Sequence, residues 1–295
     1  MFEIFGIPST ALFGQLLIGL INGSFYALLS LGLAVIFGML NIINFAHGAQ
    51  YMMGAFVAYF LLQSFGLNYW GALVIAPLVV GAIGVVTERL FLQWLYRLDH
   101  LYGLLLTFGL ALIIEGVFRN YFGSSGLPYR VPDALQGGQN LGFMFLPNYR
   151  AWVVVFSLAV CLATWFIIER TKLGSYLRAA TENPTLVRAF GINVPRMITL
   201  TYGFGVGLAA LAGVMAAPIY NVSPQMGAHL IIVVFAVVVI GGMGSIMGAI
   251  VTGFGLGVIE GLTKVFFPEA SNTVIFIIMA IVLLIRPAGL FGRRG

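Results

Sequence analysis

The sequence predicts an all-α, polytopic transmembrane protein with about nine membrane segments, an N-terminus outside the cell and a cytoplasmic C-terminus. Hydrophobic residues make up 61% of its 295 residues and charged residues 8%, whereas soluble proteins carry about 25% charged residues. Apolar runs recur along the chain, and roughly 20 helical residues suffice to cross the hydrocarbon core of a bilayer. No domain boundary interrupts these runs, so we expect residues 1–295 to form one transmembrane domain.

The apolar runs set the expected order of helices. The first ten residues contain no Lys or Arg, so we expect no cleavable secretory signal and a first run that stays in the membrane. The runs lie at about 11–38, 50–65, 69–92, 102–122, 151–168, 198–218, 229–262 and 273–286.

The 34-residue run at 229–262 is too long for a single span. As one helix it would reach about 51 Å, and fitting that length into a core of about 30 Å requires a tilt beyond the usual range of about 0 to 40°. We expect a break at Gly241-Gly242-Met243-Gly244-Ser245, where residues of weak helix propensity cluster. Counting the two halves separately gives nine segments, although 229–241 is short enough to be re-entrant.

Basic residues predict the orientation, because Lys and Arg in short loops favour the cytoplasm. The loop at 169–197 holds five of the 14 Lys and Arg residues, the tail at 286–295 holds three, and the link at 88–100 holds Arg89 and Arg97. The N-terminus has none before the first run, so it is expected outside. An outside N-terminus and an inside C-terminus require an odd number of crossings, which agrees with nine.

Catalytic and metal-binding motifs are missing from the sequence. The three histidines are scattered, with no His-Glu-x-x-His and no Gly-x-Ser-x-Gly. Neither Lys172 nor Lys264 follows a glycine, so the chain has no Walker A loop for ATP. We expect no catalytic residue, no metal ligand and no cofactor in this chain, and a buried, structural Cys161.

The charged residues in the apolar runs are arranged as pairs. Glu115 and Arg119 are four residues apart, as are Glu260 and Lys264, a spacing that favours structural ion pairs on one helix face. Ion-coupled carriers generally keep an unpaired acid or an unwound ion site at mid-depth. No clear candidate is present, so a self-sufficient secondary carrier is the less favoured alternative to a transporter that is powered by other subunits.

A polar segment at 41–51 interrupts the apolar sequence. Polar groups at membrane depth are tolerated where protein or a water-filled path satisfies them. One interpretation is a helix break that lines a translocation path, and the other is an interfacial loop with a solvated histidine. The candidate path residues, here and at the glycine break, are Asn41, Asn44, His47, Gln50, Gly241, Gly242 and Gly244.

The basic loop contains a predicted short helix from Asn183 to Gly191. Asn183 is a good N-cap, Pro184 suits the first turn, and Gly191 suits the C-terminal stop. A helix of about seven residues is marginal alone in water. It either lies on anionic lipid or docks on a cytoplasmic partner.

Three stretches carry a resemblance to a known family: "NGSFYALLSLGLAVIFGMLNIINFAHGAQYMMGA", "GSYLRAATENPTLVRAFGIN" and "GGMGSIMGAIVTGFGLGVIEGL". They resemble the LivH-type permeases of branched-chain amino acid ABC importers, and the similarity runs in order through the ending "RPAGLFGR". The resemblance implies a transport subunit of the bacterial inner membrane, not an enzyme. It implies a branched-chain or other neutral amino acid as solute, with urea or short amides as the alternative.

The resemblance also implies partners and a coupling site. The partners are a second related permease, two ATPase subunits that bind ATP and Mg, and a periplasmic solute-binding protein, with no nucleic acid. In such importers a short cytoplasmic helix sits in a cleft of the ATPase. Carried onto this sequence, the coupling residues are Glu182, Asn183, Pro184, Arg188 and Gly191.

Overall fold

The computed structural model describes residues 3–4, 7–40, 42–96 and 98–292, so Asn41 and Arg97 lie outside it. Eleven α-helices are found in these residues. The longer ones are α1 (Ser9–Leu40), α2 (His47–Phe65), α3 (Tyr69–Leu90), α4 (His100–Phe122), α5 (Asn148–Arg170), α8 (Val194–Tyr220) and α10 (Ile246–Phe266). The shorter ones are α6 (Lys172–Glu182), α7 (Pro184–Ala189), α9 (Ala228–Gly241) and α11 (Val274–Ile285).

The predicted break in the long apolar run is confirmed. The helix α9 ends at Gly241, and α10 begins at Ile246, where the Ser245 side chain accepts a hydrogen bond from the Gly248 amide at 3.1 Å. Within the described residues, six helices are long and apolar enough to cross a membrane: α1, α3, α4, α5, α8 and α10. The apolar helices α9 and α11 are shorter, and α2, with 19 residues, is not among the six.

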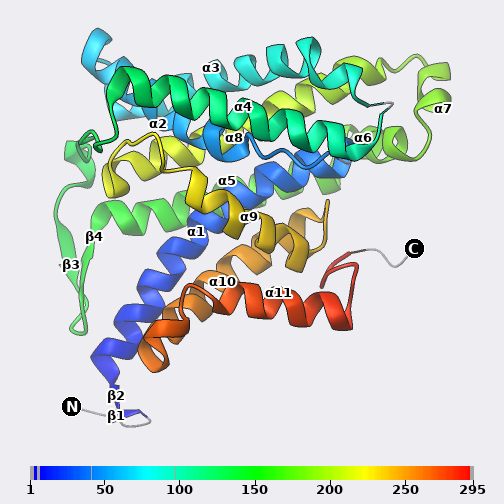
Figure 1. Cartoon of the computed structure of the whole chain (residues 1–295). Coiled ribbons are helices and arrows are strands. Elements are labelled where there is room, and N and C mark those ends of the chain that lie inside the picture. Colours follow the sequence, from blue (N-terminus) through cyan, green and yellow to red (C-terminus); the bar gives the residue numbers. More distant parts are fainter. Residues whose placement is uncertain (1–2, 5–6, 41, 97, 293–295) are drawn as a thin grey trace.

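The centre of the molecule is α1, which contacts α10, α8, α5 and α9. Figure 1 shows it running diagonally between the other helices. Close packing with α10 depends on glycine, because a Cβ at Gly253 or Gly257 would collide with the backbone of Ala27 or Gly23. Small residues at such positions let the backbones of two membrane helices approach closely.

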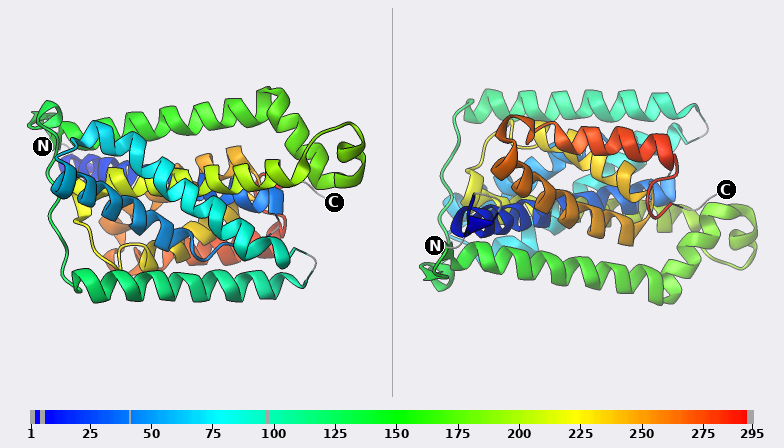
Figure 2. Two further views of the ribbon diagram at one scale, coloured as in Figure 1. Left: turned by 90° about the horizontal axis from the view of Figure 1, so that it is seen from above. Right: turned by 90° about the horizontal axis from the view of Figure 1, so that it is seen from below.

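The helices α4 and α5 lie on opposite edges of the bundle (Figure 2). In the most apolar stretch of α4, 11% of the residues are buried, whereas 83% are buried in the corresponding stretch of α1. The bundle therefore has a buried inner helix and apolar outer helices, which is the arrangement expected of a protein in contact with lipid.

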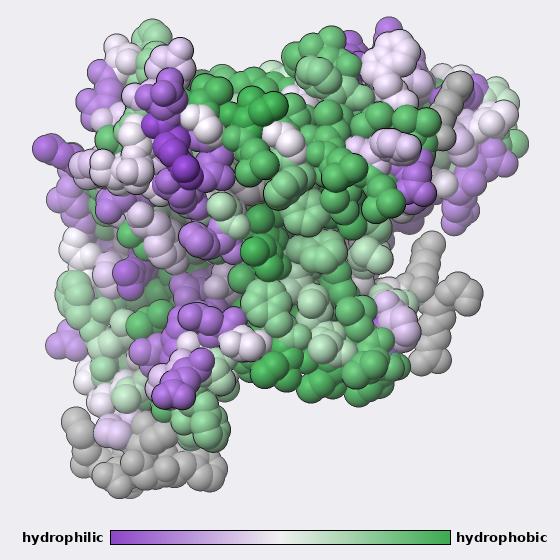
Figure 3. All heavy atoms as spheres, viewed as in Figure 1, coloured by the Kyte–Doolittle hydropathy of each residue, from purple (hydrophilic) through white to green (hydrophobic). Residues whose placement is uncertain are grey.

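Two small hairpins were not predicted. Strand β1 (Glu3–Ile4) pairs with β2 (Ile7–Pro8), and β3 (Gly138–Asn140) pairs with β4 (Phe145–Pro147). They lie at one end of the bundle, the hairpin end, whereas α6, α7 and the end of α11 lie at the other, the α7 end (Figure 1). Hydrophilic residues gather at the hairpin end and around α6 and α7, and hydrophobic residues cover the middle (Figure 3).

Three short 3₁₀ turns complete the described elements. They are η1 (Leu92–Trp94), η2 (Asp133–Leu135) and η3 (Pro268–Ala270). Helix starts nearby carry local caps, since Asn68 accepts from the Gly71 amide and Asp99 from the Leu101 amide. These caps fix where α3 and α4 enter the bundle.

Candidate functional site

The first helix break lies inside the bundle. The segment at 42–46 turns back from the end of α1, and the first residue of α2, His47, places its Nε2 atom 2.9 Å from the carbonyl oxygen of Leu29 in the middle of α1. The start of α9 meets α2 at the same depth, because a Cβ at Gly48 would lie 2.6 Å from the carbonyl oxygen of Gly227. Two short helices thus begin side by side within the apolar part of the molecule.

The polar residues of this break form a buried cluster. Asn44 and His47 have no exposed surface, and Gln50 is 4% exposed. The Asn44 amide donates to Gln50 Oε1 at 3.0 Å, and the Gln50 amide donates to the Tyr202 hydroxyl of α8 at 3.4 Å. His47 is therefore not a solvated residue of an interfacial loop.

Two atoms of the cluster have no protein hydrogen-bond partner in the described part of the chain. They are the side-chain oxygen of Asn44 and Nδ1 of His47. A buried polar atom without a partner is costly, so such atoms are candidates for contact with water or a polar solute. Tyr202 belongs to the same cluster, and sequence reasoning missed it because it is 152 residues from Gln50.

A cavity of about 220 Å³, the α4 pocket, lies on the other side of the break. It is enclosed by the start of α2, the start of α9 and the middle of α4, and apolar side chains dominate its wall. The residues on that wall include Phe45, Phe108, Leu112, Glu115, Ile231 and Ile232. Glu115 is the one charged side chain among the residues that line it.

The second break, at 242–245, lies at the α7 end and is built differently. Gly242 and Gly244 have φ of 102° and 82°, values that L-residues with a side chain rarely adopt. The carbonyl oxygens left free at the end of α9 accept hydrogen bonds from the C-terminal segment: Leu290 donates to Ile240 at 2.8 Å and Phe291 donates to Gly241 at 3.0 Å. The C-terminal segment therefore caps this break.

A second cavity, of about 370 Å³, joins this break to α6, and we call it the α6 pocket. It is bounded by the end of α1, the turn at 243–246, the C-terminal segment and one face of α6. Its wall includes Gly38, Leu177, Arg178, Thr181, Gly244 and Phe291. Of the three path glycines that were predicted, Gly244 lines this pocket, whereas Gly241 and Gly242 line neither this pocket nor the α4 pocket.

The predicted short helix is present as α7. Asn183 Oδ1 accepts from the Leu186 amide at 3.0 Å, Pro184 occupies the first turn, and Gly191, with φ of 81°, follows the helix end. The preceding helix α6 was not predicted; Arg178 anchors it to the end of α5 through Glu169 Oε2 at 3.1 Å and the Ile168 carbonyl at 3.0 Å.

The helix α7 buries one residue and exposes the others. Val187 packs with Ala180 and Val194 in a small apolar cluster. Leu186 is 55% exposed and Phe190 is 77% exposed, and Arg188 is exposed between them. The protruding end of the molecule (Figure 2) thus presents apolar side chains beside a basic one.

A buried carboxylate lies where α3 approaches the start of α8. Glu88 of α3 is 2% exposed and accepts hydrogen bonds from the hydroxyl groups of Tyr96, at 2.5 Å, and Thr199, at 2.7 Å. Burial, together with the hydrogen bond to Glu88 and its charge, raises the pKa of the Tyr96 hydroxyl above its ordinary value. The cluster ties α3 and Tyr96, which follows η1, to the second turn of α8.

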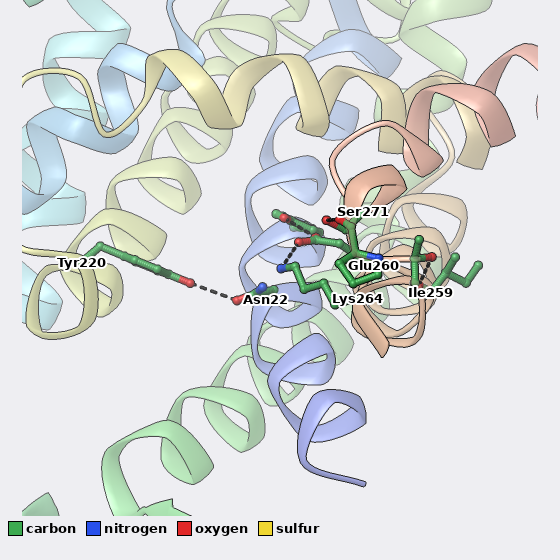
Figure 4. Close-up of polar contacts among 9 residues, drawn as sticks. Asn22, Tyr220, Ile259, Glu260, Lys264 and Ser271 are labelled. Atoms are coloured by element: carbon green, nitrogen blue, oxygen red, sulfur yellow. Dashed lines mark hydrogen bonds and ion pairs between the residues drawn. The ribbon is translucent and has the colours of Figure 1, made fainter. Parts of the chain in front are cut away.

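The predicted ion pairs are confirmed. Arg119 lies 3.0 Å from Glu115 and Lys264 lies 2.5 Å from Glu260. The second oxygen of Glu260 accepts from Tyr26 of α1 at 2.7 Å, and Tyr220 of α8 reaches Asn22 of α1 at 3.0 Å (Figure 4). Glu260 has two partners and therefore holds α10 to α1, a structural role.

Residues 15–283 match the family model described as branched-chain amino acid transport system / permease component. The chain is 31% identical, over 95% of both chains, to the high-affinity branched-chain amino acid transport system permease proteins LivH of Escherichia coli (strain K12) and BraD of Pseudomonas aeruginosa. It is 28% identical to LivM of Escherichia coli (strain K12), over 90% of this chain and 67% of LivM.

One solved structure also matches. It is PsaBC from Streptococcus pneumoniae in complex with Fab, with a TM-score of 0.42 and 17% identity, covering 94% of this chain and 89% of that chain. The family match and the 31% identity decide the assignment. The protein is a multi-pass membrane protein of the branched-chain amino acid transport permease family.

Proposed function

We propose that this chain is one of two permease subunits in an ATP-driven importer of the bacterial inner membrane, and that its solute is a branched-chain or other neutral amino acid. The relatives LivH and LivM are both permease proteins of the high-affinity branched-chain amino acid transport system of one organism. Their similarity to this chain supports pairing with a second, related permease. Two ATP-binding subunits, which hold ATP and Mg, and a periplasmic solute-binding protein complete the assembly.

The observation that carries the proposal is the module made by α6 and α7. It protrudes from the α7 end and exposes Leu186 and Phe190. Its other face borders the α6 pocket beside the turn that follows α9. An ATPase that grips α7 therefore moves α6, and α6 moves the turn at 243–246. The chain has no Walker A loop of its own, so the force comes from a partner.

The module also sets the proposed orientation. The α7 end is cytoplasmic, and the hairpin end, with the N-terminus, faces outward. Together with the six long apolar helices, the helices α2, α9 and α11 make up the nine proposed membrane segments. Solute passes at the first break, where Asn44, His47 and Gln50 offer neutral hydrogen-bonding groups among apolar walls.

The test is purification of the assembled complex through a tag on this chain, after coexpression with the transporter genes that neighbour it. We expect two ATPase subunits and a second permease to copurify. In proteoliposomes we expect leucine uptake that requires both ATP and the solute-binding protein. Gradient-driven uptake by this chain alone would instead support a self-sufficient carrier. If the cognate binding protein bound urea or short amides and not amino acids, the solute of this transporter would be urea or a short amide.

A further inference from the structure

The α4 pocket suits a small solute with an apolar part and one positive charge. Its volume of about 220 Å³ is below the range of about 300–1,000 Å³ that is usual for drug-sized ligands. The five largest apolar side chains on its wall come from three separate segments: Phe45, Phe108, Leu112, Ile231 and Ile232. Phe108, Leu112 and Ile232 are about half exposed, so the pocket opens at the surface of the bundle. Its apolar wall favours an aliphatic group over a polar one.

The charge on the wall is a carboxylate. Glu115 lines the pocket and pairs with Arg119, whose guanidinium is the more exposed partner, 54% against 21% for the Glu115 side chain. A carboxylate of which one oxygen is engaged can accept a second charge-assisted hydrogen bond through its other oxygen. An ammonium group is the complementary ligand.

We infer that the α4 pocket is a transport subsite for a zwitterionic amino acid, with its aliphatic side chain between Ile231 and Leu112 and its ammonium group at Glu115. This inference rests on the proposed function and adds where the solute is held. The location fits passage, because Phe45 and Gly48 of the pocket wall belong to the first break. The solute thus lies between the break and α4, against the edge of the bundle.

The test uses thiol labelling in the assembled transporter. Cys161 is the sole cysteine of this chain and is buried, so Cys161→Ser leaves this chain without thiols, and labelling is read on this chain after its separation from the other subunits. Ala111→Cys places a thiol in the pocket, and Ile113→Cys, on the exposed side of the same helix, is the control. Both are labelled with a small maleimide in proteoliposomes, with the binding protein, nucleotide and leucine present or absent.

Leucine at ten times its half-saturating concentration is expected to slow labelling at position 111 about ten-fold in at least one nucleotide state, and to leave position 113 unchanged. Equal labelling with and without leucine in every state would overturn the inference. The inference would also be overturned if position 111 were shielded from labelling in the complex without solute but labelled in the separated chain. A partner side chain or lipid would then fill the pocket.

A second measurement tests the carboxylate. Glu115→Gln and Arg119→Gln each break the same ion pair, and Arg119→Gln leaves the less exposed charge unpaired, so a purely structural role predicts that Arg119→Gln is at least as harmful as Glu115→Gln. Contact with the solute predicts that Glu115→Gln raises the half-saturating leucine concentration by about ten-fold or more and that Arg119→Gln changes it less than three-fold. Equal effects would overturn the assignment of Glu115. Absence of ATP-dependent uptake in the unmodified complex would contradict the proposed function itself. The labelling result and the comparison of the two variants test only the subsite, so the two kinds of failure are distinguishable.

Discussion

The two helix breaks of this protein begin from similar sequences and differ in structure. Each is followed by Met-Gly-Ala, at 53–55 within α2 and at 247–249 in the first turn of α10. The first break lies in the interior, where the buried Asn44 and His47 each keep one polar atom without a protein partner. The second lies at the α7 end, where amides of the C-terminal segment satisfy the free carbonyls of α9.

The difference indicates a division of roles. Unpartnered polar atoms in an apolar interior suit transient contact with a solute, since they have hydrogen bonds still to make. A break whose helix-end carbonyls are hydrogen-bonded to another segment suits transmission of force, because that segment and the break move together. The first break is therefore expected to control solute passage, and the second to control coupling.

The largest effect is expected from closing the space between the two helix starts. In Gly48→Val the side chain collides with the carbonyl of Gly227, which lies 2.6 Å from the Cβ position. We expect a destabilisation of about 1–3 kcal/mol or more and loss of uptake, measured by thermal unfolding in detergent and by transport. The control is Gly109→Ala, where a Cβ has open space. Normal unfolding and uptake of Gly48→Val would contradict the packing.

The second prediction addresses the capped break. Gly289 has φ of 80°, and its Cβ position lies 2.5 Å from the Cα of Gly242. Gly289→Val is expected to detach the C-terminal segment, which costs two hydrogen bonds of about 1 kcal/mol each. Uptake falls about ten-fold while the ATPase still copurifies. Gly255→Ala, on the open side of α10, is the matched control. Full uptake by Gly289→Val would contradict the proposal that the second break controls coupling.

A third change removes the polar link at the first break. Gln50→Leu leaves Asn44 Nδ2 and the Tyr202 hydroxyl without their partner, at a cost of about 1–3 kcal/mol in stability. Gln63→Leu, on the exposed part of the same helix, is expected to change stability by less than about 0.5 kcal/mol. Unfolding of the two variants at the same temperature would show that the cluster is not held by Gln50.

The smallest effect is local to α7. Asn183→Ala removes the N-cap and is expected to cost about 1 kcal/mol of helix stability, whereas Asn183→Asp retains an acceptor for the Leu186 amide. Hydrogen exchange at 185–190 measures the change. Unchanged exchange in Asn183→Ala would mean that the cap does not hold the helix.

The sequence predicted those features that depend on neighbouring residues or on membrane dimensions. Asn183 and Pro184 mark a helix start by local chemistry, and the run at 229–262 had to break because it exceeds the membrane. The hydrogen bond of Gln50 to Tyr202, the contact of His47 with Leu29 and the capping of Gly241 by Phe291 were not predictable, because no local pattern records which distant segments meet. The hairpins were missed because strands of two or three residues carry no periodicity.

The measurement that tests coupling most directly is transport by the double variant Arg188→Glu and Gly191→Pro. Arg188 is exposed on α7, and Gly191 adopts φ of 81°, which proline cannot reach. We predict that the helix bundle of this chain keeps its thermal stability. The ATPase subunits no longer copurify with it, and no ATP-dependent uptake is measured. Wild-type uptake with the ATPase subunits still bound would contradict the account.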